Sequence, residues 1–459
     1  MKNKTTVFLL FGIIISILFA ACSLFGGIDE IHENAIEENK PKTPLTGTPV
    51  IIGDKYVNAK LTATAGTLNV KTGLTYQWKR GDINIGSNSS TYTVVAEDKN
   101  QNITVTVTHE GFAGSVTSDA FNIPNNAKTG IYSKENFLAI PNYTGNQGIE
   151  YILCNNITLD DNTITRATGM VTNTMQDASF TFYGTFDGNG KQIDIGSQTF
   201  SMGSPGLFGS MQSGSKVKNL KMKGAIIYSG GSTNMYIGAL ASQNSGTILN
   251  VSSRVTVAGT HTGSGDIYAG GLVGRMSSSG SSIVNCYTYN GDTLVSASGG
   301  SSQRAGGIIG SNEGGTVQYC WTYGKITTPT TSGLAGGIAG SFSSGVITCC
   351  VALNSSVQGY SMGRITTGSP GGLSKNFAKT DMWLPDYGNQ ASGGTMSNKN
   401  GADVSDSTYI SESWWNTGSD PGWSAYWGGT ENPDKPWKWS TNLRPVLWFE
   451  ADLYSLANP

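Results

Sequence analysis

Three short glycine blocks decide the fold of this 459-residue chain: Gly270-Gly-Leu-Val-Gly274, Gly306-Gly-Ile-Ile-Gly310 and Gly336-Gly-Ile-Ala-Gly340. Two related blocks precede them, Gly206-Leu-Phe-Gly209 and Gly238-Ala-Leu-Ala241. The last residues of successive blocks lie 32, 33, 36 and 30 positions apart. Self-similarity with a period near 30 residues is typical of repeat architectures. The second block departs from the pattern, which leaves the register of that repeat open.

A second apolar strand follows each block, and Gly, Ser and Asn fill the corners between them. One such repeat cannot bury its apolar face alone, whereas stacked repeats can. Glycine allows the backbone to turn tightly at each corner. Period and composition therefore predict a parallel β-helix. Aligning the blocks predicts an inward-facing column with rungs about 4.8 Å apart, made of Leu220, Val251, Cys286, Cys320 and Cys350.

The blocks and the strands after them, such as Ile283-Val-Asn-Cys286, resemble the GLUG motif. The segment Gly184–Gly190 resembles the entry to such proteins, and Asn376–Met382 and Arg444–Trp448 resemble their ending. The resemblance covers about 130–450 and implies a right-handed β-helix of a bacterial, often adhesin-like, surface protein. The crossover rule supports that hand. Some GLUG proteins also carry an immunoglobulin-cleaving zinc peptidase, but the zinc motif of that peptidase is absent from this sequence.

Residues 46–124 contain several short runs in which apolar and polar residues alternate, as in Leu74–Trp78 and Ile103–Val107. This period of two predicts half-buried strands. Tyr76-Gln-Trp78-Lys-Arg80 and the runs after it resemble a bacterial immunoglobulin-like repeat. We therefore expect an immunoglobulin-like β-sandwich with Trp78 in its core. The domain has no cysteine, so no disulfide can join its sheets.

The N-terminus reads as an export signal, because two lysines precede an apolar run from Val7 to Phe19. Leu18-Phe-Ala-Ala-Cys22 makes residues 1–21 resemble a bacterial lipoprotein signal peptide, which implies that Cys22 is lipidated. Ser23 then implies sorting to the outer membrane, and residues 22–45 predict a flexible tether after the lipid. A plain secretory signal or an uncleaved membrane helix is the alternative.

Composition excludes several functional classes. The formal net charge is −2 and charged residues make up 13%, so a nucleic-acid partner is not expected. The three histidines are scattered and form no zinc motif. Asp187-Gly-Asn-Gly190 is better explained as a tight turn than as a calcium site. We predict no cofactor, no metal site and no catalytic residue.

Five cysteines remain besides Cys22, at positions 154, 286, 320, 349 and 350. An exported chain permits disulfides. In the inward-facing column predicted above, three of these five cysteines, Cys286, Cys320 and Cys350, would instead act as small buried apolar side chains. Both interpretations stay open here.

Residues 361–459 predict a Trp-rich terminal coil and cap, since eight of the ten tryptophans lie after residue 380. A solenoid needs a cap on its last coil, or the open edge pairs with other chains. The alternative is a platform on which sugar rings stack. The tryptophans expected to be exposed in that case are Trp414, Trp415, Trp423 and Trp427.

The sequence thus predicts an all-β, lipid-anchored envelope protein, held to the membrane by its N-terminal lipid and exposed on the cell surface. An immunoglobulin-like domain (46–124) would present a right-handed parallel β-helix (125–360). The expected function is adhesion to a host or neighbour-cell protein or glycan, without enzymatic activity. A structural envelope scaffold is one alternative. A β-helix enzyme acting on polysaccharides is another, and it would need charged residues gathered in one cleft.

Overall fold

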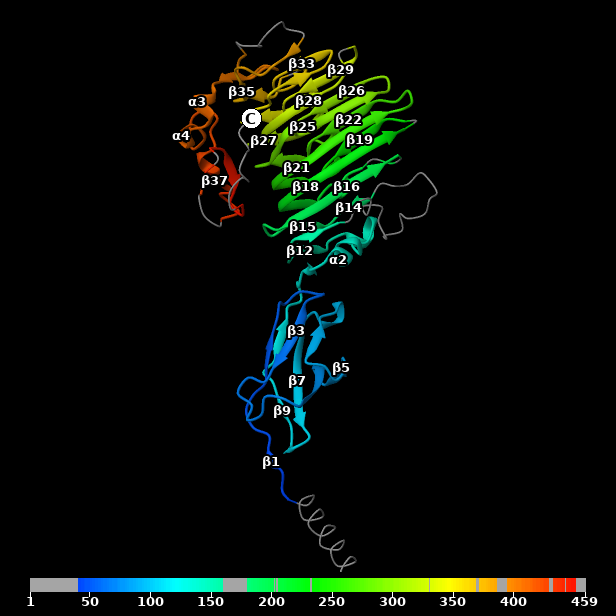
Figure 1. Ribbon diagram of the computed structural model, residues 1–459, viewed down its shortest axis with the longest axis vertical. Coiled ribbons are helices and arrows are strands. Elements are labelled where there is room, and N and C mark those ends of the chain that lie inside the picture. Colours follow the sequence, from blue (N-terminus) through cyan, green and yellow to red (C-terminus); the bar gives the residue numbers. More distant parts are fainter. Residues whose placement is uncertain are drawn as a thin grey trace, which may run out of the picture. The chain divides into compact units, whose positions relative to one another are not determined.

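The computed structural model of the chain describes residues 40–159, 180–368, 371–385, 394–428 and 432–450, apart from residues 202, 204, 232, 330 and 442 (Figure 1). The described chain forms two compact units. The first contains the residues up to Lys55 together with 59–127, and the second contains 56–58 and everything from Lys128 onward. The predicted signal peptide (1–21), the predicted lipidation site Cys22 and most of the predicted tether lie outside the described residues.

The first unit consists of antiparallel sheets and one short parallel pair. Three strands form one sheet in the order β2-β3-β6 and five strands form another around β7. The strands alternate buried and exposed positions, and Trp78 and Leu61 are fully buried. The bounds are β1 Thr43–Pro44, β2 Val50–Ile52, β3 Lys60–Thr64, β4 Leu74–Arg80, β5 Ile83–Ile85, β6 Thr91–Thr93, β7 Gln101–His109, β8 Phe112–Ala113, β9 Val116–Thr117 and β10 Phe121–Ile123.

A buried acid organises one end of this unit. The Asp98 carboxylate is fully buried and accepts hydrogen bonds from Arg80 Nε at 2.6 Å, Tyr92 Oη at 2.8 Å and the Val95 amide at 2.8 Å. Three donors compensate the carboxylate for the water it loses. Two antiparallel sheets around Trp78 match the alternation in the sequence, and the immunoglobulin-like assignment stays a prediction.

The second unit is a parallel β-solenoid of about six turns. Within the described residues its main sheet has 21 strands and a second sheet has five. Figure 1 shows these strands stacked in successive coils. The main-sheet strands are β11 Thr129–Ile131, β12 Glu150–Leu153, β13 Ile157–Thr158, β14 Thr181–Phe182, β15 Thr185–Asp187, β16 Gln192–Phe200, β17 Ser210–Met211, β18 Lys216–Gly230, β20 Ala241–Asn244, β21 Thr247–His261, β23 Val273–Met276, β24 Ser282–Val284, β25 Tyr287–Gly299, β27 Ile309–Gln318, β28 Trp321–Thr327, β30 Ala339–Thr348, β31 Val351–Ala352, β32 Val357–Gln358, β34 Leu373–Ser374, β35 Phe377–Lys379 and β36 Ala402–Val404.

The second sheet runs β19 Met235–Gly238, β22 Ile267–Gly270, β26 Gln303–Gly306, β29 Gly333–Gly336 and β33 Ser361–Gly363. The remaining elements are short. They are the helices α2 Lys134–Leu138, α3 Asp406–Tyr409 and α4 Glu412–Trp415, the 3-10 turns η1 Ala96–Asp98, η2 Tyr143–Asn146 and η4 Ser424–Tyr426, and the antiparallel pair β37 Trp437–Trp439 and β38 Pro445–Leu447. The prediction of an all-β chain carrying a parallel solenoid is confirmed, and its handedness stays a prediction.

The glycine blocks connect the two sheets. In each coil a second-sheet strand such as β22 ends at the first glycine of a block, and a main-sheet strand such as β23 starts after it. A Cβ atom on Gly310 would lie 2.6 Å from the Gly274 carbonyl oxygen and 2.8 Å from the Ala269 nitrogen. Real Cβ contacts are never this short, so backbone packs directly on backbone here. A side chain therefore has no space at Gly310.

The irregular second block keeps this arrangement. Gly238 pairs with Gly270, and Ala241 pairs with Val273 rather than with Gly274. Ser242 therefore follows at the position where the next coil has Gly274. The register of the coil is preserved, and one glycine of the block is replaced by serine.

The predicted inward column is confirmed. Leu220 pairs with Val251, and both belong to one buried apolar cluster with Cys286, Cys320 and Cys350. Each of the five is fully buried. The three cysteines are free thiols, and burial raises the pKa of Cys320 and Cys350 well above the ordinary thiol value. They act as small core residues, as the ladder interpretation requires.

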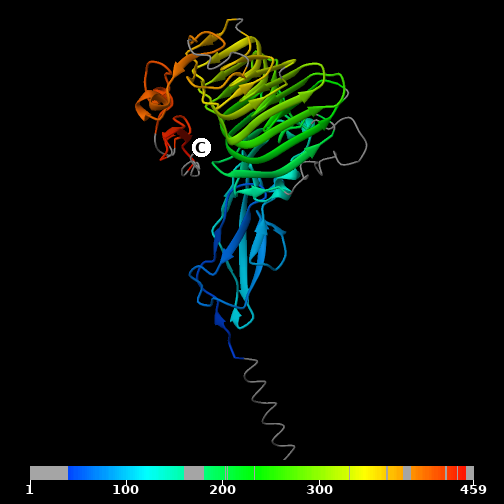
Figure 2. The same ribbon diagram turned by 45° about the horizontal axis from the view of Figure 1, so that its top comes forward.

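The Trp-rich C-terminal segment, residues 405–450, lies along the side of the solenoid as well as near its last coil. Figures 1 and 2 both place α3, α4 and β37 beside the main sheet. Trp437 Nε1 donates to Asn285 Oδ1 at 3.1 Å, and Trp423 Nε1 donates to the Cys349 carbonyl at 2.9 Å. Asn250 Nδ2 reaches the Pro433 carbonyl at 3.1 Å. The segment therefore spans several coils instead of closing the last one alone.

This side contact buries a second apolar core. Tyr287 and Trp321 point outward from neighbouring coils and stack with ring centroids 4.5 Å apart and planes 6° apart. Trp415, Trp423 and Trp437 of the C-terminal segment pack in the same cluster, and all five side chains are almost fully buried. Aromatic residues bury large areas and give offset or edge contacts beyond simple burial.

Substitution of Gly310 by alanine tests the backbone contact between the sheets. We expect Gly310→Ala to lower the free energy of unfolding by about 1–3 kcal/mol, because the new methyl group must displace backbone. Gly291→Ala is the matched control, since a Cβ there meets nothing within 4 Å. Urea unfolding measures both variants. Equal stability of the two would contradict the proposed packing.

Glu450 anchors the end of the C-terminal segment and gives a pH test. Its carboxylate accepts hydrogen bonds from Tyr287 Oη at 2.6 Å, Ser252 Oγ at 2.8 Å and the Leu447 amide at 3.0 Å. Burial nevertheless raises its pKa above the ordinary 4.5. The folded chain thus favours the protonated form. The resulting stabilisation is complete below the ordinary pKa and is lost as the pH rises through the raised value.

We expect Glu450→Gln to remove this part of the pH dependence, because glutamine is neutral at every pH. Tryptophan fluorescence during urea unfolding, from pH 4 to pH 8, follows the segment directly. The wild type should lose stability relative to Glu450→Gln as the pH rises. Glu412→Gln, an exposed change in the same segment, should behave as the wild type does. Parallel pH profiles for wild type and Glu450→Gln would refute the assignment.

Candidate functional site

The tryptophans proposed as a sugar platform lie mainly inside the C-terminal core. Trp415 and Trp423 are fully buried, with ring centroids 4.7 Å apart, so their faces are not open to a ligand. Trp414 is half-buried and packs edge-on against Phe377 at 5.3 Å. Trp427 is half-buried and donates from Nε1 to Glu412. These contacts suit the cap interpretation better than an exposed platform.

A different set of side chains gathers on the outer face of the second sheet. Tyr236, Tyr268, Arg304 and Leu334 occupy equivalent positions on β19, β22, β26 and β29. Each is the residue two positions before the first glycine of its block. Successive residues of a strand face opposite sides. Because the neighbours Ile237, Ala269 and Ala305 are buried in the core, these four side chains face outward.

Two tyrosines and two arginines form a stack at this position, which we call the Tyr–Arg site. The rings of Tyr236 and Tyr268 lie 4.9 Å apart. The Arg304 guanidinium lies 4.4 Å from the centre of the Tyr268 ring, and that of Arg275 lies 5.3 Å from the Tyr236 ring. Guanidinium groups on ring faces gain from the negative charge of the π cloud. The stack holds all four side chains in defined positions.

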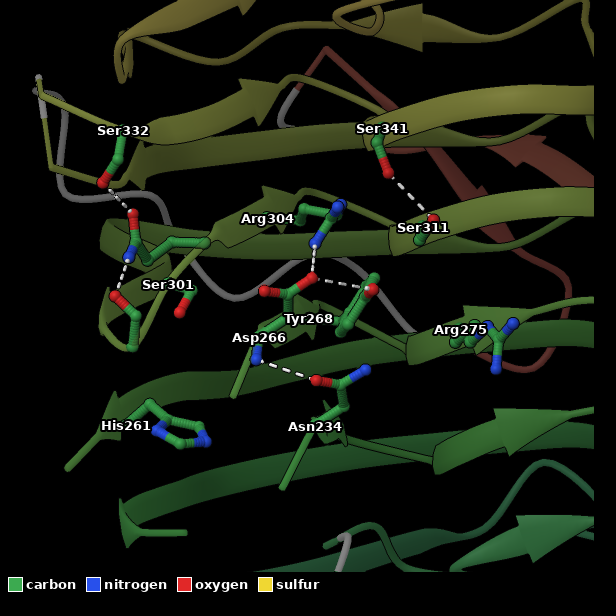
Figure 3. Close-up of polar contacts among 12 residues, drawn as sticks. Asn234, His261, Asp266, Tyr268, Arg275, Ser301, Arg304, Ser311, Ser332 and Ser341 are labelled. Carbon is green, nitrogen blue, oxygen red and sulfur yellow. Dashed lines mark hydrogen bonds and ion pairs between the residues drawn. The ribbon is translucent and has the colours of Figure 1, made fainter. Parts of the chain in front are cut away.

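Two carboxylates complete the Tyr–Arg site. Asp266 accepts from Arg304 Nη1 at 3.0 Å and from Tyr268 Oη at 3.3 Å, as Figure 3 shows. Glu313 lies on the next coil from Arg275 and accepts from its Nε at 2.9 Å and from its Nη2 at 2.6 Å. The four charged side chains remain between 20% and 29% exposed. They are thus held firmly and still reach solvent.

Hydroxyl and amide groups surround these ion pairs. Ser311 Oγ donates to Glu313 Oε1 at 3.0 Å, and Ser341 Oγ donates to Ser311 at 2.8 Å. Asn234 Oδ1 accepts from the Asp266 amide at 2.9 Å, and Figure 3 shows this contact beside the Arg304–Asp266 ion pair. Burial raises the pKa of the Tyr268 phenol, so the phenol keeps its proton at neutral pH and acts as a donor.

The arrangement offers ordered donors and acceptors on a rigid surface. The hydrogen bonds that Arg275 donates to Glu313 raise the pKa of Arg275 above its ordinary value, so its guanidinium stays charged at neutral pH. Fixed side chains lose little freedom when a ligand binds, which favours affinity. Among the described residues, no group of three or more His, Cys, Asp or Glu side chains is placed to hold a metal ion.

The Tyr–Arg site could not be predicted from the sequence, because the charged residues between 206 and 360 are few and do not repeat in register. The column instead carries Tyr, Tyr, Arg and Leu, and each arginine pairs with an acid 38 residues away. The sequence did carry one signal of the site, namely the repeated position two residues before each glycine block, which places these side chains in one column. One alternative from the sequence was a β-helix enzyme acting on polysaccharides, and a neutral outer face would have counted against that alternative. The outer face is not neutral, since it carries four charged side chains.

Comparison with known proteins identifies solved structures that share the fold, but it assigns the chain to no family. No family model and no curated protein matches the chain. A solved structure provisionally described as an immunoglobulin A1 protease from Bacteroides ovatus is similar over 71% of this chain and 94% of its own, with a TM-score of 0.51 and 19% identity. A second, described as an IgA1 protease, has a TM-score of 0.40 and 14% identity, and the match covers 73% of this chain and 27% of that one.

The first comparison corrects one prediction from the sequence. The expectation that the chain has no enzymatic activity is contradicted, since a solved structure provisionally described as a protease shares its fold. At 19% identity the likeness identifies the fold and no shared catalytic residue. No helix in the described ranges has the length and apolar character to cross a membrane.

Proposed function

We propose that this chain is a lipid-anchored protein of the bacterial cell surface whose solenoid binds a carbohydrate or protein ligand at the Tyr–Arg site. The observation that carries the proposal is the exposure of two fixed ion pairs, Arg304–Asp266 and Arg275–Glu313, on one face of the solenoid. Only 13% of the residues in this chain are charged, yet four charged residues lie together at the Tyr–Arg site. Isolated surface ion pairs add little to stability, so stability alone does not account for the cluster.

The chemistry of the site suits a ligand rich in hydroxyl groups. Each ion pair presents donors and acceptors side by side, and such a pair can bind two neighbouring hydroxyls of a sugar at once. Opposite charges are balanced within the site, so an uncharged ligand meets no net repulsion or attraction. The proposed anchor at Cys22 would hold the solenoid at the envelope, and several acyl chains bind a membrane durably.

Binding by the Tyr–Arg site is tested with arginine variants. We expect Arg304→Gln and Arg275→Gln each to weaken ligand binding about 10- to 100-fold, because a charge-assisted hydrogen bond contributes about 1.5–3 kcal/mol. The assay is a screen against immobilised neutral glycans, matrix proteins and immunoglobulin A1, whose cleavage is followed in the same samples. Immunoglobulin A1 is included because the description of the similar structure names it.

Lys325→Gln is the control for that screen. It removes a positive charge that is more exposed, at 52%, and whose partner, Asp292, lies outside the Tyr–Arg site. Its binding should equal that of the wild type. A ligand that binds all three variants as tightly as the wild type does would show that the Tyr–Arg site is not the binding surface.

The anchor is tested in cells. We expect protease treatment of intact cells to remove the 46–124 domain, and Cys22→Ser to release the chain from the membrane fraction, because the thioether to the lipid cannot form. Immunoblotting of shaved cells and of membrane fractions measures both. Full protection until the envelope is broken would refute surface exposure and favour a scaffold facing the periplasm.

A further inference from the structure

The Tyr–Arg site is the middle of a longer surface that repeats from coil to coil. On the second sheet its outward column consists of Tyr236, Tyr268, Arg304 and Leu334, which pair in register on β19, β22, β26 and β29. Strands that pair in this way lie about 4.8 Å apart. Each coil therefore supplies one rung of the column, and the Tyr–Arg site occupies the first three rungs of four.

A second outward column lies on the main sheet, across the glycine blocks from the first. It consists of Gln243, Arg275, Ser311 and Ser341, one residue on each rung. The residue that follows each of these four is buried, so the four side chains face outward. Arg275 Nη1 donates to Tyr236 Oη at 3.3 Å and thereby joins the two columns. Figure 3 shows Arg275, Ser311 and Ser341 on successive strands. We call the two columns together the four-rung face.

The charges on the four-rung face lie on its two middle rungs, and they cancel. The Arg304–Asp266 pair joins the third rung to the second. The Arg275–Glu313 pair joins the second rung to the third. On the first and last rungs both columns carry uncharged side chains. The Tyr268 ring is only 8% exposed. The face therefore offers a ligand balanced hydrogen-bond donors and acceptors rather than an open aromatic ring or a net charge.

The distance between rungs discriminates among extended polymers. A peptide strand rises about 3.3 Å per residue, and its side chains return to the same side after about 6.6 Å. Such a strand falls out of step with rungs that are about 4.8 Å apart. A β-1,4-linked chain of pyranose sugars is an extended ribbon whose rings repeat at nearly the rung distance, with hydroxyl groups along both edges. One ring can therefore meet one rung, with a column of side chains under each edge.

We propose that the four-rung face binds an uncharged β-1,4-linked glycan along the solenoid axis, with one sugar ring on each rung. This inference rests on the proposed function, and it adds the linkage, the charge and the length of the ligand. The two central rings meet the ion pairs, and the outer rings meet uncharged side chains such as Gln243 and Ser341. Because the stacked tyrosines and arginines are already fixed, little freedom is lost when the glycan binds.

The test measures how affinity depends on the number of sugar rings. Isothermal titration calorimetry of the purified full-length chain uses β-1,4-linked glucose oligomers with two, three, four and six rings. We expect each added ring up to the fourth to tighten binding about two- to tenfold, the effect of one further hydrogen bond. The fifth and sixth rings should add little, because they lie beyond the face.

Linkage and substituent are tested in the same assay. Maltotetraose, whose α-1,4 linkages curve the chain, should bind about tenfold more weakly than cellotetraose, because it leaves the outer rungs. Chitotetraose has the same β-1,4 linkage and a different uncharged substituent, and it tests the same geometry. The absence of measurable binding by both cellotetraose and chitotetraose would overturn the inference. So would tighter binding of an extended glycine–serine peptide.

A variant on the first rung separates this inference from the proposed function. We expect Gln243→Ala to weaken cellotetraose about two- to tenfold and to leave cellobiose, which the central ion pairs hold, unchanged. Gln318→Ala is the matched control, since Gln318 is a half-buried residue of β27 that belongs to neither column. It should bind every oligomer as the wild type does.

The outcomes distinguish the two claims. Affinity that stops rising at two rings, equal binding of maltotetraose, or unchanged binding of cellotetraose by Gln243→Ala would overturn the four-rung inference. The proposed function would survive those results if Arg304→Gln still weakened the ligand. Both claims would fail if Arg304→Gln and Arg275→Gln bound every oligomer as tightly as the wild type does.

Discussion

Direct contact between the backbones of the two sheets is the constraint on which the solenoid depends. At Gly274 and Gly310 a main-sheet strand touches the backbone of a second-sheet strand, with no room for a side chain between them. The contact recurs in successive coils, and it turns the chain sharply without an intervening loop. The residue two positions before each glycine block then lies on the outer face at a repeating position, which is how Tyr268 and Arg304 come to lie side by side. The same feature that closes the coil therefore aligns the candidate binding face.

The side of the solenoid has a different chemistry because the C-terminal segment covers part of it. Along one outward column Ser252 is followed by Tyr287, Trp321 and Val351, so the surface becomes apolar from coil to coil. The tryptophans of the C-terminal segment pack where that column is aromatic. Burying these faces against each other removes apolar surface from water, the main favourable contribution to folding. The aromatic residues thus serve as a second core.

The sequence predicted the features that depend on local periodicity. A period near 30 residues was enough to align Cys286 with Cys320 and to place both in the core, because register and face follow from counting. The Tyr–Arg site could not be found in this way, since Tyr268 and Arg304 differ in chemistry and Glu313 joins Arg275 only after one full coil. Contacts such as Ser252 with Glu450, 198 residues apart, follow from no local rule. Such contacts depend on where the C-terminal segment docks on the solenoid. The tryptophan content of the segment predicted only a cap on the last coil, not a contact along the side.

The C-terminal segment also restricts how this protein can change over evolution. A simple stack of repeats can gain or lose one unit at little cost, because each unit touches only its neighbours. Here one segment contacts Asn250, Asn285 and Cys349 through fixed hydrogen bonds, and these residues belong to three coils within a run of four. Deleting a single coil would shift every later contact by one rung and leave the tryptophans facing the wrong partners. The number of repeats between these points is therefore fixed by the segment that crosses them, and variation in length is confined to the coils outside its reach.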